Sequence, residues 1–516
     1  MGIPSYFRKI IQRYPGILCE RVADCSVLCF DFNCLVYRCI HAPSVLALEV
    51  PSPGDEEAMD IWEATLLREV CRTVKEVWIE AGRPRQVYIA VDGVVPMAKI
   101  RQQRVRRFKS AYLRVPGKNT WDTNSITPGT AFMTKLGRHL HTLAKEHGRG
   151  WIVSASDEPG EGEHKIMSWL RQHKTTGTVC IYGLDADLIL LSMLTGEMIS
   201  NKNLWLMREK QEFGAQIAPK PDQKQEYTFM NLEEFKLRVG VKGVNEVLNY
   251  VGLMSLMGND FLPHSLTHKL NDDGHDCVLQ ELRKMKQSAQ WLVNAEGQLQ
   301  KDILLGICSK WAEEEEGRML FMIRKKKEQA VRGVGKGMDA SEGLPLQWNV
   351  EKVMIEVGDH DDSVKLKETW RSEYWNFIHP VADRGHICSE YVYGLQWILD
   401  YYTGQAATNT SWIFPSWIPP LWSDLARILK AGEIQGFVRE TSAAIQPEEQ
   451  LAMVLPLDSW GLIRDKNLRR LPALLPQMWP LKYSFFSVGR KWLWECEARV
   501  PILTAERARE ILKGVE

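Results

Sequence analysis

Four short runs of apolar residues, rich in β-branched side chains, recur along the first 190 residues of the chain. Their sequences are CSVLCF at 25–30, QVYIAV at 86–91, WIVSA at 151–155 and TVCIY at 178–182. Stretches of helical character lie between them, for instance at 60–81 and 130–148. Strands that alternate with helices in this way predict a parallel α/β sheet that is covered by helices on both faces.

The rest of the chain has mainly helical periodicity. A buried helix is expected at 247–257. A second stretch, at 310–329, carries acidic residues at 313–316 and basic residues at 324–327, which is typical of a solvated helix face. The polar segment 209–227 and the glycine-rich segment 333–344 predict loops, and tryptophan-rich segments follow at 396–422 and 477–494.

The composition is that of an ordinary globular protein with room for more than one domain: 516 residues, 45% hydrophobic and 25% charged. No apolar run approaches the roughly 20 residues that a membrane-spanning helix needs. Eleven cysteines without a CxxC pair indicate neither a zinc site nor a disulfide framework. We therefore expect an intracellular protein with reduced cysteines.

An acidic residue follows each predicted strand closely. The third strand leads into EPGEGEHK at 158–165, the fourth into GLDAD at 183–187, and the apolar helix into GND at 258–260. Ligand sites in open α/β sheets lie beyond the carboxyl ends of the strands. This topology gathers seven carboxylates at one edge: Asp31, Asp92, Glu161, Glu163, Asp185, Asp187 and Asp260. One such residue alone is more typical of a helix cap or a turn, but seven together favour a shared site.

A gathering of carboxylates constrains the chemistry of that site. Two ionised carboxylates ~4 Å apart repel by roughly 4 kcal/mol at an effective dielectric constant of about 20, so several together require cations or protons. Sets of oxygen ligands suit Mg²⁺ or Mn²⁺ rather than zinc. Two such ions ~3.5–4 Å apart form the arrangement that cleaves phosphodiesters.

A basic segment follows Asp92. Six of the eleven residues at 99–109 are Lys or Arg and none is acidic, although the whole chain has 65 basic and 65 acidic residues. A solvated helix normally intersperses glutamate, so we interpret this segment as a site for phosphate or another polyanion.

At this point the sequence resembles the Xrn-type 5′-to-3′ exoribonucleases. The opening MGIPSYFRKIIQRYP is similar to that family's N-terminus. FDFNCLVYRCIH, VDGVVPMAKIRQQRVRRF, TNSITPGTAFM, EPGEGEHKIM, YGLDADLILL and MGNDFLPH resemble its first conserved region in order. SEYVYGLQWILDYYTG and SWIFPSWIPP resemble its second conserved region.

The resemblance implies a PIN/FEN-like nuclease core with a largely helical second region packed around it. We expect a nuclease region at 1–270, a helical connection with a charged and glycine-rich loop at 271–350, and the second conserved region at 351–516. The resemblance also implies processive degradation of single-stranded RNA with a 5′-monophosphate to nucleoside 5′-monophosphates. Two Mg²⁺ ions, replaceable by Mn²⁺, would be held by the seven carboxylates.

The resemblance further implies particular roles for other residues. Lys99, Gln103, Arg106 and Arg107 would bind the 5′-phosphate. Tyr37 occupies the position at which the family has a histidine that stacks on the terminal base. Trp412 is the candidate for the residue that stacks on the opposite face of that base, and the alternative is that Trp412 is simply a core residue. We expect a cytoplasmic protein and keep the nucleus as the alternative location; its protein partners are unknown.

Two other functions are compatible with parts of this pattern. A flap-type, structure-specific 5′ DNA nuclease shares the α/β core and the carboxylates, but Asp260 is followed by FLPHS rather than by the Gly-x-Gly pattern of that class. A catalytically inactive RNA-binding scaffold would typically have lost carboxylates, whereas all seven are present.

Overall fold

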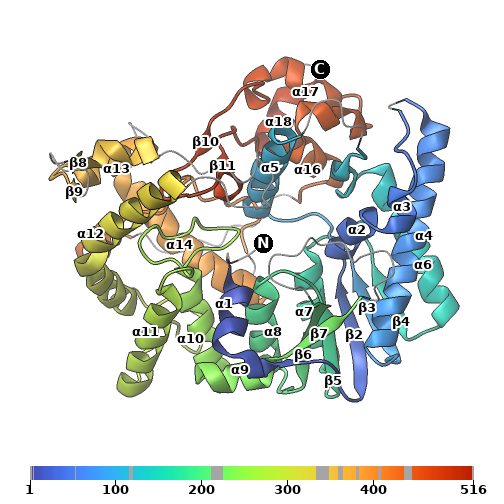
Figure 1. The fold of residues 1–516 in the computed structure, drawn as a ribbon, viewed down its shortest axis with the longest axis horizontal. Helices are drawn as coiled ribbons and strands as arrows, with labels where there is room; N and C mark the ends of the chain where they lie inside the picture. The colour runs from blue at the N-terminus through green and yellow to red at the C-terminus, as the bar shows by residue number, and fades with distance from the viewer. Residues whose placement is uncertain are drawn as a thin grey trace.

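The structure is a computed structural model, and it describes residues 3, 5–52, 54–114, 120–210, 225–332, 348–357, 364–378, 383–404, 408–434 and 444–513. A seven-stranded sheet lies in it with the strand order β1-β7-β6-β5-β2-β3-β4 (Figure 1). Strands β2 to β6 run parallel to one another, whereas β7 is antiparallel to both β6 and β1. The bounds are β1 (Leu18–Cys19), β2 (Cys25–Asp31), β3 (Gln86–Ala90), β4 (Trp151–Ser154), β5 (Thr178–Tyr182), β6 (Leu204–Glu209) and β7 (Tyr227–Asn231).

The four predicted strands are confirmed as β2, β3, β4 and β5, while β1, β6 and β7 were not predicted from the sequence. Strand β6 ends in Arg208 and Glu209, a charged pair that obscures its apolar pattern. Glu209 is nevertheless buried, because Arg38 donates a hydrogen bond to its carboxylate at 2.8 Å. Tertiary pairing, and not local hydropathy, allows this strand to lie in the sheet.

Helices cover both faces of the sheet, as the sequence predicted. Successive side chains of a strand point to opposite faces, and in β2 Val27 and Cys29 pack in one core while Leu28 and Phe30 pack in another. The first core includes α7 (Gly162–His173), α8 (Asp187–Met198) and α10 (Gly243–Ser255). The second includes α4 (Glu56–Glu80) and α6 (Ala131–His147), the helices predicted at 60–81 and 130–148.

The other helices and short strands form the rest of the fold. They are α1 (Tyr6–Arg13), α2 (Asn33–Ile40), α3 (Pro43–Leu46), α5 (Met97–Tyr112), α9 (Leu232–Val239), α11 (Gly274–Ser288), α12 (Lys301–Arg332), α13 (Trp370–Ile378), α14 (Arg384–Thr403), α15 (Trp422–Ala431), α16 (Pro447–Val454), α17 (Leu471–Leu474), α18 (Ala505–Lys513), β8 (Ile355–Val357), β9 (Val364–Leu366), β10 (Phe485–Phe486) and β11 (Glu497–Ala498). Helix α10 covers most of the stretch predicted at 247–257, and α12 contains the one at 310–329.

The predicted solvated face of α12 is confirmed in part. Glu313, Glu314 and Glu316 are exposed, but Glu315 is buried and accepts a hydrogen bond from the Ser423 hydroxyl at 2.6 Å. The predicted loop at 333–344 and residues 211–224 of the predicted loop at 209–227 lie outside the described residues. The division of the chain at residues 270 and 350 stays a prediction.

Helix α5 packs against segments that are distant from it in sequence, because it is embedded in the C-terminal part of the chain (Figure 1). Its Val105 and Phe108 share a core with Leu451 of α16 and Ala508 of α18. The guanidinium of Arg104 is fully buried and donates hydrogen bonds to three backbone carbonyl groups, those of Met453 at 2.7 Å, Pro501 at 2.8 Å and Met478. The largely helical second region is therefore packed directly on the basic segment that was singled out in the sequence.

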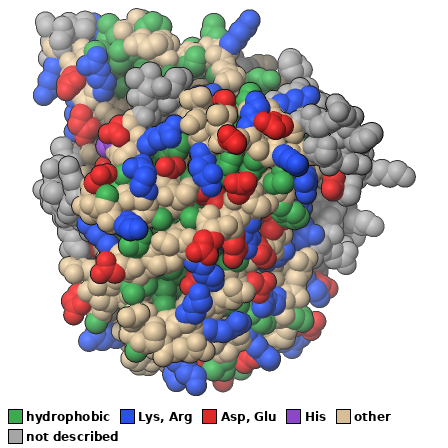
Figure 2. Space-filling model, turned by 90° about the vertical axis from the view of Figure 1, so that its left-hand side faces the viewer, with side chains coloured by type: hydrophobic (Ala, Val, Ile, Leu, Met, Phe, Trp, Pro, Cys, Tyr) green, Lys and Arg blue, Asp and Glu red, His purple; other side chains and the backbone are tan. Residues whose placement is uncertain are grey.

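Among the described residues, the side of the molecule that carries α11 and α12 shows no comparable concentration of charge of one sign (Figure 2). Figure 2 shows basic and acidic side chains mixed over that face. None of the helices that the structure describes combines the length and the apolar character that crossing a membrane would take.

Candidate active site

The seven predicted carboxylates lie at the carboxyl ends of the strands and at the starts of the helices that follow. Asp31 ends β2, Asp92 follows β3, and Glu161 and Glu163 lie at the N-terminus of α7. Asp185 and Asp187 lie between β5 and the first turn of α8, and Asp260 follows α10. The side chains interact electrostatically as one group: Asp31 with Asp92, Asp185 and Glu161; Glu163 with Glu161, Asp187 and Asp31; and Asp187 with Asp260 and Asp185.

Close packing at Gly162 brings two of these carboxylates to the start of α7. A Cβ atom on Gly162 would lie 2.7 Å from the Ala90 carbonyl oxygen and 2.8 Å from Asp31 Oδ1, so only glycine fits. The Gly162 N–H donates a hydrogen bond to Asp92 Oδ1 at 2.7 Å. The glycine between the two glutamates of EPGEGEHK is thus part of the site, a role that is not evident from the sequence pattern.

Two further residues hold carboxylates in place and were also missed. Asn33 Nδ2 donates to Asp92 Oδ2 at 2.8 Å, and the Asp92 N–H donates back to Asn33 Oδ1 at 3.3 Å. The Tyr401 hydroxyl, on α14 of the second region, donates to Glu161 Oε1 at 2.8 Å. Asn33 lies in the string FDFN and Tyr401 in the string LDYYTG, and both strings resemble the family. The strings do not indicate which residues Asn33 and Tyr401 contact.

Lys99 lies among the carboxylates, and its role as a phosphate ligand stays a prediction. Its Nζ is 2.5 Å from Glu161 Oε2 and 2.7 Å from Asp260 Oδ2. Burial would lower the pKa of Lys99, but Asp260 and Glu161 raise it well above its ordinary value. Burial likewise opposes ionisation of Asp260, whose pKa is lowered by Lys99 and Arg106. Lys99 is thus a cation within the acidic group.

Lys99 does not offset the negative charge of all the remaining carboxylates. Burial, followed by the charges of Asp92 and Asp185, raises the pKa of Asp31 well above its ordinary value. Burial and Glu161 do the same for Glu163, and burial and Asp260 raise the pKa of Asp187 to about 7. Without a further cation, some of these groups are protonated near neutral pH, because several close negative charges cannot be ionised together.

The donor atoms fit a hard divalent cation. Ligand atoms of Glu161, Glu163 and His164 lie within 4.8 Å of one another. Among the described residues, Glu163 Oε2 and His164 Nε2 are buried and have no hydrogen-bond partner. A buried polar atom without a partner costs about 1–3 kcal/mol, so a cation at this point would relieve an unfavourable arrangement. The surrounding oxygen atoms match the preference of Mg²⁺ or Mn²⁺.

The other predicted phosphate ligands lie along α5. The charge of Arg106 acts on Asp260, and Arg106 is close to Tyr37. Arg107 donates to Asn124 Oδ1 at 2.8 Å, and burial lowers its pKa to about 10. Gln103 Oε1 is 3.5 Å from Gln450 Nε2 of α16. The structure therefore brings Arg106 and Arg107 to the side of Tyr37, next to the acidic group, and it turns Gln103 toward the second region.

The two predicted stacking residues have different surroundings. Tyr37 is half-buried on α2 near Arg106 and Arg107. Trp412 is only 7% exposed, and its indole N–H donates to Glu390 at 2.9 Å. Its ring packs against that of Trp397, with centroids 5.2 Å apart. This packing leaves little of the Trp412 ring for a base and favours the alternative role in the core.

Comparisons with known proteins agree with this geometry. Residues 1–210 match the family model described as "XRN 5'-3' exonuclease N-terminus", and residues 346–516 match the one described as "Xrn1 helical domain". The chain belongs to the Xrn family. Its first region is the PIN-like nuclease domain of that family, which is generally dependent on divalent metal ions, and the acidic group is a candidate for that metal site.

Several relatives in the Xrn family are named as 5'-3' exoribonucleases. The 5'-3' exoribonuclease 1 of Homo sapiens is 25% identical over 99% of this chain and 34% of its own length. The 5'-3' exoribonuclease 1 of Saccharomyces cerevisiae is 28% identical over 58% of this chain and 22% of its own, and the 5'-3' exoribonuclease 2 of Kluyveromyces lactis is 32% identical over 51% and 34%. The chain therefore spans about a third or less of the length of these relatives.

Proposed function

We propose that this chain is a divalent-metal-dependent 5′-to-3′ exoribonuclease. Its substrate would be single-stranded RNA with a 5′-monophosphate, and its products nucleoside 5′-monophosphates. One observation carries the proposal: helix α5 brings Lys99 into the group of seven carboxylates and brings Arg106 and Arg107 beside it. A metal site for phosphodiester cleavage and a cationic site for a terminal phosphate are then neighbours. Family membership and the names of the relatives support the same activity.

Mg²⁺ is the metal proposed, with Mn²⁺ as a substitute, and two ions are expected. Asp31, Asp92, Glu161, Glu163, Asp185, Asp187 and Asp260 would hold them, because all are oxygen donors within one buried group. The ions would stabilise the negative charge that develops on the scissile phosphate and promote attack by water.

The protein's own groups would orient this site. Asn33 and the Gly162 N–H fix the two oxygens of Asp92, and Tyr401 fixes Glu161. Lys99 offsets part of the negative charge and can reorient toward a phosphate oxygen when cations pair with Glu161 and Asp260. Arg106 and Arg107 would bind the terminal phosphate, since guanidinium groups form paired hydrogen bonds with phosphate oxygens. That contact would set the direction of digestion.

The decisive test is a time course on RNA that carries a 3′ label and a 5′-monophosphate, a 5′-triphosphate or a 5′-hydroxyl. We expect rapid loss of the monophosphorylated RNA with release of mononucleotides, and slow loss of the other two. A 5′-flapped DNA duplex and a metal-free reaction serve as comparisons. Preference for the flap would favour the structure-specific DNA nuclease, and binding of RNA without cleavage in Mg²⁺ or Mn²⁺ would favour the inactive scaffold.

Processive action and a cytoplasmic location are parts of the proposal that have separate tests. Processivity would appear as full-length RNA and mononucleotides without intermediates when an excess of unlabelled RNA is added after the start. The location would follow from fractionation of cells that express the tagged chain, with recovery in the nuclear fraction as the opposing outcome.

A further inference from the structure

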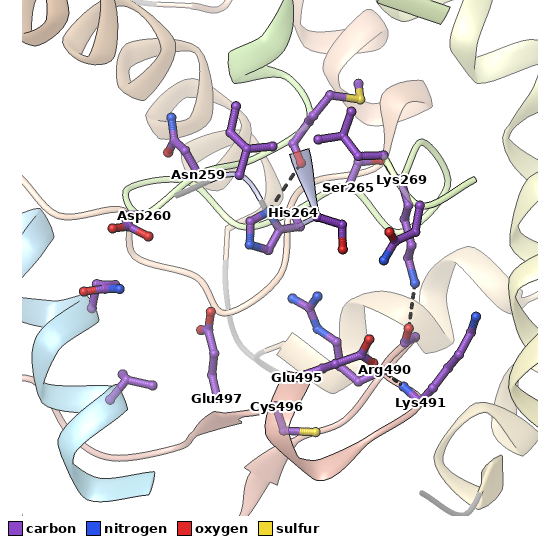
Figure 3. Close-up of a pocket in the computed structure, with 18 of the residues that line it drawn as sticks. Asn259, Asp260, His264, Ser265, Lys269, Arg490, Lys491, Glu495, Cys496 and Glu497 are labelled. Carbon is purple, nitrogen blue, oxygen red and sulfur yellow. Dashed lines mark hydrogen bonds between the residues drawn. The ribbon is translucent and has the colours of Figure 1, made fainter. Parts of the chain in front are cut away.

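A cavity of about 400 Å³ opens beside Asp260, and its wall extends well beyond the acidic group (Figure 3). Gln102, Val105, Arg106 and Lys109 line it from α5. These positions follow the helical spacing of three to four residues and therefore share one side of the helix. Gln103 and Arg107, which contact Gln450 and Asn124, are not among the lining residues. Helix α5 thus presents one side to the cavity and another to the predicted phosphate site, with Arg106 next to both.

The wall of the cavity is rich in positive charge. Seven lining residues are basic: Arg101, Arg106, Lys109, Lys269, Lys325, Arg490 and Lys491. Four are acidic: Asp260, Asp272, Glu495 and Glu497. Three of the acids already have partners: Asp260 pairs with Lys99, Asp272 pairs with Lys325, and Glu495 accepts from the Lys491 N–H at 2.7 Å. The side chains that line the cavity therefore carry more positive than negative charge, which suits an anionic ligand.

Lys269 and Arg490 form the centre of this cationic wall. Lys269 projects from the segment that follows α10, and Arg490 from the segment before β11 (Figure 3). Lys269 Nζ donates to the Gly489 carbonyl oxygen at 2.6 Å, so its contact is with a neutral group. Among the described residues, the buried Nε of Arg490 has no hydrogen-bond partner. Burial and the nearby Arg490 lower the pKa of Lys269 to about 7, so a bound anion would stabilise the charged form of this side chain.

The rest of the wall suits the remainder of a nucleotide. Val105, Met257, Leu270 and Met322 provide apolar surface. The buried Oε1 of Gln102 has no hydrogen-bond partner among the described residues, and it can accept from a hydroxyl or amino group. The volume lies within the roughly 300–1,000 Å³ of small-molecule sites, which combine apolar walls with a few polar groups.

We propose that this cavity binds a nucleoside 5′-monophosphate, with its phosphate at Lys269 and Arg490 and its base or ribose near Gln102. This inference rests on the proposed function, because that compound is the product of the proposed reaction. Asp260 and Arg106 line the cavity and also belong to the predicted cleavage site. A released mononucleotide therefore has a neighbouring site to enter while the next terminal phosphate binds on the other side of α5.

The test is calorimetric binding of adenosine 5′-monophosphate to the full chain without RNA, with adenosine and inorganic phosphate as separate ligands. We expect the nucleotide to bind more tightly than either part. Lys269→Gln with Arg490→Gln should weaken nucleotide binding by about tenfold or more, since the phosphate loses two charge-assisted hydrogen bonds. The matched control is Arg464→Gln with Lys466→Gln, two exposed basic residues outside the cavity, which should bind as the wild type does.

Further variants exclude trivial outcomes. Lys269→Arg keeps the charge and should keep the affinity, whereas Gln102→Ala should weaken binding of the nucleotide and leave binding of inorganic phosphate unchanged. Equal affinity in the Lys269, Arg490 double variant and the wild type would overturn the proposal, as would binding that depends on Arg107 alone. RNA cleavage is measured separately: nucleotide binding at Lys269 and Arg490 without cleavage would refute only the proposed function, and cleavage without nucleotide binding would refute only this inference.

Discussion

The Tyr401 hydroxyl donates a hydrogen bond to Glu161 Oε1 at 2.8 Å, across 240 residues of sequence. Glu161 lies at the start of α7 in the nuclease region, and Tyr401 lies on α14 in the second region. The second region thus contributes directly to the orientation of a predicted metal ligand. A region that packs beside the nuclease core also determines part of its geometry.

Replacement of Tyr401 by Phe should lower the rate of RNA cleavage by about 10- to 100-fold, because groups that orient metal ligands have effects of that size. The concentration of Mg²⁺ needed for half-maximal rate should rise. The neighbouring Tyr402 is the matched control: it is buried, and among the described residues its hydroxyl has no hydrogen-bond partner. Tyr402→Phe should therefore leave both quantities nearly unchanged, and equal losses in the two variants would show that the Tyr401–Glu161 contact is unimportant.

Replacement of Lys99 by Met should have opposite effects on metal binding and turnover. Removal of the cation leaves Glu161 and Asp260 without their partner, so the metal-free protein should melt at a lower temperature and bind Mg²⁺ more tightly. Cleavage should nevertheless fall strongly. Calorimetric melting with and without Mg²⁺, together with a Mg²⁺ titration, measures both effects. Lys99→Arg retains a positive charge, and unchanged metal affinity in Lys99→Met would contradict the placement of Lys99 in the metal site.

Replacement of Arg106 and Arg107 by Ala should abolish the preference for RNA with a 5′-monophosphate over RNA with a 5′-hydroxyl. Each lost guanidinium–phosphate contact removes a charge-assisted hydrogen bond. The measurement is the ratio of kcat/KM for the two substrates. Arg114→Ala is the control, since Arg114 is exposed just beyond α5 and pairs with Asp122 at 3.5 Å. Persistence of the wild-type ratio in the double variant would place the phosphate site elsewhere.

Replacement of Asp185 by Asn should abolish cleavage and leave the affinity for RNA largely intact, because the substitution removes one negative charge and almost no volume. Single-turnover cleavage and filter binding of a 5′-phosphorylated RNA measure the two properties. Asp458→Asn changes an exposed carboxylate outside the acidic group and should behave as the wild type. An active Asp185→Asn variant would mean that the metals bind without this residue.

The acidic group should make the metal-free protein less stable as the pH rises. Burial and Asp260 raise the pKa of Asp187 to about 7, above the value of about 3.9 for an unfolded aspartate. The folded state therefore holds a proton that the unfolded state has lost, and this contribution to stability disappears as the pH increases from about 4 through 7. In EDTA, raising the pH from 5.5 to 8 should lower the unfolding free energy of the wild type more than that of Asp187→Asn. The difference between the two losses should be about 1 kcal/mol or more, measured by thermal unfolding. Added Mg²⁺ should reduce this difference; parallel pH profiles for the two proteins would refute the assignment.

The position of the acidic residues at one edge of the sheet was predictable because the features that determine it are local. Each of the four strands is a short apolar run, and Asp31, Asp92 and Asp185 follow these runs within three residues. Once the strands are parallel, their carboxyl ends must meet. Strand β6 was missed because Arg208 and Glu209 interrupt its pattern, and Glu209 is buried only through contacts with Arg38 and Tyr182 from distant segments.

The contacts of individual side chains depend on distant segments, and these were not predictable. A basic run predicts a positive surface, but it does not reveal that Lys99 turns toward Glu161 while Gln103 turns toward Gln450. Trp412 is similar: the same residue type suits a stacking platform and a packed core, and only the contact with Trp397 and the hydrogen bond to Glu390 distinguish the two.

The burial of Arg104 among carbonyl groups of residues 453, 478 and 501 has a practical consequence for dissecting this protein. A fragment that stops after the sheet would expose the apolar side chains of α5, such as Val105 and Phe108, and would leave the Arg104 guanidinium without its three carbonyl acceptors. Such a truncation should be poorly soluble when it is produced alone. Co-expression of the two halves as separate polypeptides should restore a soluble complex, so the N-terminal catalytic region is better regarded as one part of an obligate pair than as a portable module.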